Sequence, residues 1–222
     1  MRGMDAVFTM STPFEAGLEA ETRQGFAVAD ATSSAGIAHL VFSSVGSADR
    51  KTGIPHFESK YQVKQRIREL GVPHTVIRPV YFFENIFNLF VLPGLKAGKL
   101  ATALPADRLL QQVSVRNIAS FAVLALENRD SFLGRSIDIA SDEVTGEQAA
   151  RVLSEVSGRS IEYVQTPLED VRAMSEDFAL DVEWMIQVGY DADIPGLRGE
   201  FPEVGWETFE EWARRQSWTI LD

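Results

Sequence analysis

The segment from His39 to Asn85 constrains the fold of this chain more than any other, because two short apolar runs in it flank one amphipathic run. Residues 40–42 and 75–77 are apolar runs of the length and kind that form buried strands. Between them, residues 57–70 alternate charged and apolar residues at helical spacing and stop at a glycine. A strand–helix–strand unit with buried strands predicts a parallel sheet and therefore an α/β fold.

Polar residues follow both apolar runs, at the carboxyl ends of the expected strands. Ser43 and Ser44 follow the first run, and Arg78 and Pro79 follow the second. Ligands of open α/β sheets bind just beyond the carboxyl ends of the strands. The sequence therefore predicts a ligand site near these four residues.

The alternation of strands and helices continues along the whole chain. We expect strands at residues 5–10, 39–42, 75–77, 136–139 and 161–165, and a short extended piece at 113–115. We expect helices at residues 15–34, 57–70, 82–92, 117–127 and 145–157, and a mainly helical region at 168–221. Thr145 and Gln148 have the spacing of a capping box. The C-terminal region, from about residue 134 to 222, is expected to be a substrate lobe integrated into a single domain spanning residues 1–222.

Composition and charge exclude several classes of protein. The chain has 222 residues, 45% of them hydrophobic, which suffices for one well-packed domain. Its formal net charge of -11 argues against a nucleic-acid partner, since a phosphate backbone would be repelled. It has no cysteine, no visible signal peptide, and no apolar segment long enough to cross a bilayer. We expect a cytoplasmic protein without a membrane partner.

Several short segments, in the right order, resemble the NmrA-like branch of the atypical short-chain dehydrogenase/reductases. Residues 5–13 are similar to the family's fourth strand and following loop, and residues 42–44 to the end of its fifth. Arg78-Pro79 with Glu84-Asn85 resembles the family's RP…EN signature, and residues 113–118 resemble a later segment. The resemblance implies a Rossmann-type parallel sheet with helices on both faces and an NAD(P) cofactor.

The glycine-rich turn of the family is absent from this sequence. No G-x-x-G-x-x-G or G-x-G-x-x-G spacing follows any expected strand, and these glycines normally bring the backbone to the pyrophosphate. We expect an N-terminally truncated chain with a partial sheet, in which residues 5–10 form an exposed edge that favours self-association. Binding of NADP or NAD is then expected to be weak or absent.

Lys60 and His56 are the candidate catalytic residues. Related short-chain dehydrogenases carry a Tyr-x-x-x-Lys pair, in which the lysine holds the nicotinamide ribose and the tyrosine supplies a proton. Here His56 stands at the tyrosine position, and a spacing of four puts both side chains on one helical face. An imidazole with a pKa of about 6.5 has the chemistry to donate a proton. From spacing alone, a solvated lysine and a capping histidine fit better, and the family context favours a functional role for Lys60 only.

The resemblance also implies a set of cofactor-binding residues, which share a position at the carboxyl ends of strands. These residues are Met10, Ser11, Thr12, Ser43, Ser44, Lys60, Pro79, Val80 and Phe82. Turn formation, strand-end hydrogen bonding and core packing account for the same residues equally well when each is taken alone. No metal-ligand spacing is present.

Two functions are compatible with these features. The first is an NAD(P)H-dependent oxidoreductase that reduces small apolar carbonyl or quinone-type substrates. The second is a non-catalytic NAD(P) sensor that binds a regulatory protein partner. The missing tyrosine favours the sensor. The lysine favours the reductase, and so does the wall against nicotinamide and substrate that the resemblance implies for Pro79, Val80, Tyr81 and Phe82.

Overall fold

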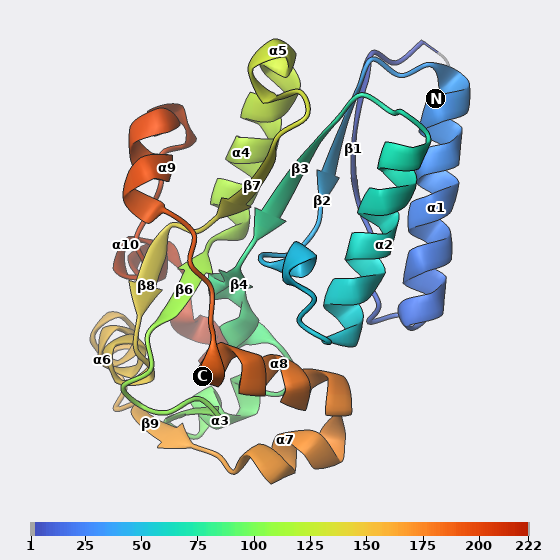
Figure 1. Cartoon of the computed structure of the whole chain (residues 1–222). Coiled ribbons are helices and arrows are strands. Elements are labelled where there is room, and N and C mark those ends of the chain that lie inside the picture. Colours follow the sequence, from blue (N-terminus) through green and yellow to red (C-terminus); the bar gives the residue numbers. More distant parts are fainter. Residues whose placement is uncertain (1–2, 222) are drawn as a thin grey trace. The chain divides into compact units, whose positions relative to one another are not determined.

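The computed structural model of the chain describes residues 3–221 (Figure 1). It divides into two compact units, which are described separately. The first unit contains Met1–Pro79 and Ile118–Ile139, and the second contains Val80–Asn117 and Ala140–Asp222. The second unit includes the lobe expected from about residue 134 only from Ala140 on, together with an earlier segment that the sequence did not assign to it. The single-domain organisation stays a prediction.

The first unit is built on a four-stranded parallel sheet with the strand order β1-β2-β3-β7. The strands are β1 (Ala6–Met10), β2 (His39–Ser43), β3 (His74–Pro79) and β7 (Ser136–Ile139). Every residue of β2 is buried, in agreement with a strand covered on both faces. The predicted parallel α/β fold is confirmed.

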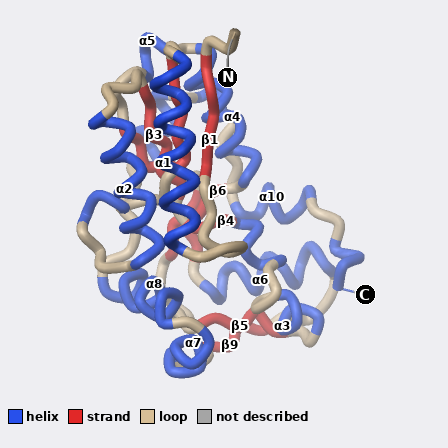
Figure 2. Tube along the Cα trace, turned by 90° about the vertical axis from the view of Figure 1, so that its right-hand side faces the viewer, coloured by secondary structure: helices blue, strands red, loops and turns tan. Residues whose placement is uncertain are grey.

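Helices cover both faces of this sheet, as Figures 1 and 2 show. Helices α1 (Leu18–Ala35) and α2 (Pro55–Glu69) lie on one face, and α4 (Val115–Glu127) and α5 (Arg129–Phe132) lie toward the other. Gly36 ends α1 in the left-handed conformation, which favours glycine. A side-chain carbon at Gly25 would lie 2.3 Å from a methyl group of Val63, so glycine is what lets α1 and α2 approach so closely.

Strand β1 is the open edge of the four-stranded sheet, as predicted. Its residue Phe8 is 41% exposed and Met10 is 60% exposed. An edge strand with unpaired backbone groups and exposed apolar side chains favours pairing with another chain. We therefore expect the 222-residue chain to self-associate through β1, and Phe8→Lys to reduce the association. Light scattering across a concentration series checks this, and a wild-type chain that stays monomeric at high concentration would contradict it.

The second unit contains two small sheets. One has the strand order β4-β6-β8, and the other pairs β5 with β9 in parallel. The strands are β4 (Tyr81–Phe82), β5 (Lys99–Thr102), β6 (Leu110–Val113), β8 (Asp142–Val144) and β9 (Glu162–Gln165). The helices are α3 (Leu92–Lys96), α6 (Gly146–Ser157), α7 (Leu168–Met174), α8 (Glu176–Gln187), α9 (Ile194–Glu200) and α10 (Phe209–Arg215). Phe83, Leu153, Phe209 and Trp212 lie in its core. The mainly helical C-terminal region is confirmed, and so is the capping box of Thr145 and Gln148.

Two boundaries expected from the sequence are wrong. Residues 82–92 do not form one helix: a short 3-10 helix, Phe83–Phe87, is followed by a turn before α3 begins. The Asn88 side chain accepts hydrogen bonds from the backbone of Phe90 and Val91 at 2.9 Å, which stabilises the turn in place of a helix. Val115 is not extended but begins α4.

The helices of residues 3–221 include none with the length and apolar character needed to cross a membrane.

Candidate functional site

The strand register of the first unit aligns the carboxyl ends of its strands. Met10 pairs with Ser43, and Ser43 pairs with Ile77. The chain after β2 stays attached to β3, because Ser44 N donates to the Ile77 carbonyl at 2.8 Å and Gly46 N donates to the Pro79 carbonyl at 2.8 Å. The segments after β1 and β2 therefore begin together at the carboxyl ends of the strands, where the sequence predicted a ligand site. This end of the sheet is called the ligand edge.

Ser43 and Ser44 are both buried at this edge, with 7% of each exposed. Among the described residues, the Ser44 hydroxyl has no hydrogen-bond partner. A buried hydroxyl that lacks a partner costs free energy unless a ligand or water satisfies it. Ser44 is thus the strand-end residue that most clearly points to a bound polar group.

Lys60 lies at the same edge, next to the end of β1. Its Nζ donates to the Ser11 carbonyl at 2.7 Å and to the Glu21 carboxylate at 2.6 Å. A lysine ammonium has three N–H donors, so these two bonds leave one donor for a ligand. The structure therefore brings together Lys60 and Ser11, which the sequence placed in one site.

Glu21 is the residue of this site that sequence reasoning missed. It lies on α1, its side chain is fully buried, and its carboxylate also accepts the Ser59 hydroxyl at 2.6 Å. Nothing in the spacing of Glu21 distinguishes it from Glu19, an exposed residue in the same first turn of the helix. Only the packing of α1 against α2 reveals that this carboxylate compensates the Lys60 charge.

His56 lies in the first turn of α2, four residues before Lys60. Its ring meets the Phe57 ring edge-on, with 4.9 Å between centroids, and its carbonyl accepts the Ser59 hydroxyl at 3.1 Å. The histidine thus belongs to the same helix turn as the residues that hold Glu21. Its role as a proton donor stays a prediction.

The remaining expected cofactor-binding residues differ in exposure. Met10 is exposed and Thr12 is half-buried, with its hydroxyl accepting the Phe14 backbone N–H at 3.4 Å. Pro79 is buried at the end of β3. Val80 is buried and Phe82 is half-buried, and both belong to the second unit. The assignment of these residues to a cofactor stays a prediction.

An ionic network surrounds Arg78 at the end of β3. Arg78 Nε lies 2.5 Å from the Asp138 carboxylate on β7, and its Nη1 contacts Asp49. Lys64 Nζ also lies 3.6 Å from Asp49 Oδ2. In the described part of the chain, neither Arg78 Nε nor Asp138 Oδ1 has an aligned hydrogen bond, so the attraction between them is ionic. The network connects β3 and β7 to the loop that follows β2.

Burial and the Arg78 charge act in opposite directions on the pKa values of the two carboxyl groups in this network, Asp138 and Asp49. Burial raises the pKa of Asp138, and the Arg78 charge only partly opposes this. Burial also acts to raise the pKa of Asp49, but the charge and hydrogen bond of Arg78 outweigh it, so that this pKa is lowered. The Arg78 charge therefore acts to lower the pKa of both carboxyl groups.

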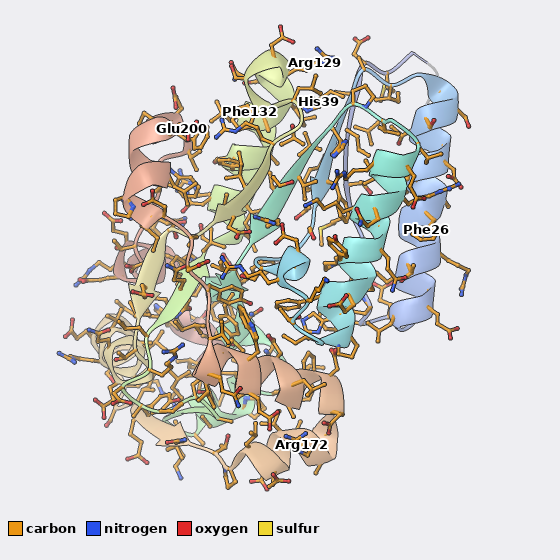
Figure 3. The ribbon with its side chains drawn as sticks, in the orientation of Figure 1. Phe26, His39, Arg129, Phe132, Arg172 and Glu200 are labelled. Carbon is orange, nitrogen blue, oxygen red and sulfur yellow. The ribbon has the colours of Figure 1, made fainter. Side chains whose placement is uncertain are left out.

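His39 lies at the opposite, amino-terminal end of the sheet, together with Arg129 and Phe132 (Figure 3). It is 1% exposed, its Nε2 is 2.8 Å from the Thr75 hydroxyl, and burial lowers its pKa. These contacts give His39 a structural role within the first unit. Within residues 3–221, no group of three or more histidine, aspartate or glutamate side chains is placed to hold a metal ion.

The sequence profile of the NmrA-like family matches residues 1–213 of this chain. A curated relative from Streptomyces griseus, a (4-alkanoyl-5-oxo-2,5-dihydrofuran-3-yl)methyl phosphate reductase, is 29% identical over 97% of this chain and 66% of its own length. The nitrogen metabolite repression protein nmr of Neurospora crassa is 27% identical over 82% of this chain and 39% of its own length. The chain thus spans less than two thirds of the length of these relatives.

Solved structures show the same fold. An NADPH-dependent quinone oxidoreductase from Escherichia coli, complexed with NADPH, superposes with a TM-score of 0.75 at 19% identity, over 96% of this chain and 76% of that one. At this level of identity the likeness establishes the fold alone.

Proposed function

Because this chain belongs to the NmrA-like family, we propose that it is an NAD(P)H-dependent reductase of small, largely apolar carbonyl or quinone-type substrates. The observation that carries the proposal is the pairing of the Lys60 ammonium with the end of β1, which leaves one N–H donor at the ligand edge. The reductases among the family's relatives support it. A cytoplasmic location and a small-molecule partner belong to the same proposal.

The residues at the strand ends fit the nicotinamide half of such a cofactor. The Ser44 hydroxyl is buried and lacks a partner within the described chain, and it offers a hydrogen bond to a carboxamide or ribose group. The remaining N–H of Lys60 would bind a ribose hydroxyl, with Glu21 and the Ser11 carbonyl fixing the ammonium in place. Pro79, buried at the end of β3, would supply an apolar surface. When bound, the cofactor supplies a hydride, and these residues orient it and exclude water.

The pyrophosphate half of the cofactor finds no matching glycine-rich turn in this sequence. Each missing charge-assisted hydrogen bond is worth about 1.5–3 kcal/mol, so losing two weakens binding by roughly a hundredfold or more. We expect the 222-residue chain to bind NADPH weakly or not at all in calorimetry. A fusion that places a glycine-rich strand–turn–helix segment of a family member before Met1 is expected to bind it more tightly. Micromolar binding by the unextended chain would contradict this argument.

Lys60 is tested in that fusion. Lys60→Ala combined with Glu21→Gln, which avoids a buried unpaired carboxylate, is expected to lower NADPH affinity about tenfold relative to Glu21→Gln alone, because a charged hydrogen bond is lost. Lys51→Ala, at an exposed position, is the control. An affinity indifferent to Lys60 would remove this residue from the site.

A sensor is the second candidate, and one observation favours it. Glu21 compensates the charge of Lys60, and the position of the family's tyrosine holds His56, so the helix lacks the usual acid. A sensor would bind the nicotinamide cofactor without oxidising it in the presence of any acceptor. Steady-state NADPH oxidation with a small quinone such as menadione separates the two functions. Turnover indicates a reductase, and cofactor binding without turnover indicates a sensor.

A further inference from the structure

A cleft of about 580 Å³ lies between α1 and α2 in the first unit. The two helices follow neighbouring parallel strands and lie side by side on one face of the sheet (Figures 1 and 2). All residues that line the cleft belong to the first unit, so its geometry is defined by that unit alone. The proposed function gives this cleft no role.

The floor of the cleft is largely apolar. Leu18 and Phe26 on α1 and Pro55 on α2 line it, and all three are half-buried. Phe26, labelled in Figure 3, packs against the buried core of the unit. Sites for small molecules are mostly apolar, with a few polar groups that fix the orientation of the ligand. The cleft therefore has the size and the floor that a small molecule with an apolar group requires.

Charged side chains of both signs also line the cleft. Glu19 and Arg23 stand one helical turn apart on α1, and Glu58 lies across from them on α2. A glutamate four residues before an arginine commonly forms an ion pair along a helix. Within residues 3–221, however, none of these three side chains has an ion-pair partner. Charges of both signs are thus available to a ligand in the cleft.

Helix stability explains only part of this arrangement. Glu19 and Glu58 lie in the first turns of their helices, where a negative charge stabilises the helix dipole. The dipole does not account for Arg23, a cation in the second turn of α1, or for the apolar floor. A molecule that carries both charges and an apolar group matches all of these features.

We propose that the cleft binds a small zwitterion with an apolar side chain, of the class of the aromatic α-amino acids. Its ammonium group lies between the carboxylates of Glu19 and Glu58. Its carboxylate contacts the Arg23 guanidinium, one turn or about 5.4 Å further along α1. Its side chain covers Leu18 and Phe26, which removes their apolar surface from water.

Two hydrogen bonds connect the cleft to Lys60. Ser59 lines the cleft and is 4% exposed, and its hydroxyl donates to one carboxylate oxygen of Glu21 at 2.6 Å. The other oxygen of Glu21 accepts a hydrogen bond from Lys60 Nζ at 2.6 Å. A charged ligand beside Ser59 therefore acts on the carboxylate that holds the Lys60 ammonium. In this respect the inference rests on the proposed function, in which Lys60 binds the cofactor, and the ligand is then a regulator of the reductase.

Calorimetry with L-phenylalanine tests the site in the 222-residue chain without cofactor. We expect a Kd of about 0.1–1 mM, and we expect Arg23→Gln and Glu58→Gln each to raise it about three- to tenfold, as for one lost charged hydrogen bond. Arg68→Gln, the same charge change at an exposed position of α2 outside the cleft, is the matched control.

Two analogues test whether both charges of the ligand are recognised. Phenethylamine lacks the carboxylate and 3-phenylpropionate lacks the ammonium, and each is expected to bind at least about threefold more weakly than L-phenylalanine. Equal binding of either analogue would overturn the zwitterion. The absence of any binding of L-phenylalanine, or an equal loss of affinity in Arg68→Gln, would overturn the site.

NMR of the lysine ammonium groups tests the connection to Lys60, again without cofactor. Saturating L-phenylalanine is expected to shift the Lys60 Nζ resonance, and Ser59→Ala is expected to reduce that shift at saturation. Lys64, which lies on the same helix but pairs with Asp49, is the internal control. An unmoved Lys60 resonance, or equal shifts of Lys60 and Lys64, would overturn the connection. A chain that binds L-phenylalanine but never oxidises NADPH would instead refute the proposed function and leave the cleft site in place.

Discussion

Glu21→Leu is expected to lower the free energy of unfolding by about 3–5 kcal/mol, because it leaves the partly buried Lys60 ammonium without its compensating charge. Only 12% of the Lys60 side chain is exposed, and Glu21 is its one ion-pair partner among the described contacts. The Ser59 hydroxyl loses its carboxylate acceptor in the same substitution. Urea unfolding followed by circular dichroism measures the effect.

A double variant separates the loss of the charge pair from a general disruption of helix packing. Glu21→Leu with Lys60→Met replaces both charges by apolar side chains and is expected to recover most of the lost stability, since such replacements of buried pairs are often neutral. Glu19→Leu, at an exposed position on the same helix, is expected to change stability by less than about 0.5 kcal/mol. A double variant as unstable as Glu21→Leu would show that packing, and not charge, is what Glu21 provides.

Arg78→Ala is expected to lower the free energy of unfolding by a similar amount, about 3–5 kcal/mol at pH 7. The Asp49 and Asp138 carboxylates then lose the cation between them at the ligand edge. The raised pKa of Asp138 means that this carboxyl loses its charge readily as the pH falls. The lowered pKa of Asp49 gives a contribution to stability that is present above its unfolded-state pKa and is lost as the pH falls through its folded-state value. The cost of Arg78→Ala should therefore shrink as the pH falls below 7, first because Asp138 gains a proton, and through Asp49 only below about pH 4.

Arg66→Ala is the matched control for this prediction. Arg66 pairs with Asp30 at 2.8 Å, but about a third of its side chain and half of that of Asp30 are exposed. An exposed pair of this kind contributes about 0–1 kcal/mol. Equal losses of stability in the Arg66 and Arg78 variants, or a cost of Arg78→Ala that does not depend on pH, would contradict a buried ionic network.

The strands and helices of the first unit could be predicted because local signals and burial agree there. Residues 40–42 are apolar and form a strand buried on both faces, and Gly36 before them favours a helix end. Residues 82–92 are just as apolar, yet Asn88 stabilises a turn within them, and apolar content alone does not distinguish a helix from a buried irregular segment.

The candidate site was only partly predictable. The family resemblance, together with the four-residue interval from position 56, singled out Lys60 as a candidate; spacing alone did not. Neither identified Glu21, which lies 39 residues away in sequence and meets Lys60 only when α1 and α2 pack.

The interleaving of the two units has a consequence for how the chain is made. Strand β7 of the four-stranded sheet comes from residues after position 135, whereas Val80–Asn117, which precedes it, belongs to the second unit. A ribosome must therefore deliver about a third of the second unit before the last strand of the first sheet exists. During that interval β3 has no partner on the side that β7 will occupy. We expect the nascent chain to depend on chaperones more than a protein whose domains emerge one after the other.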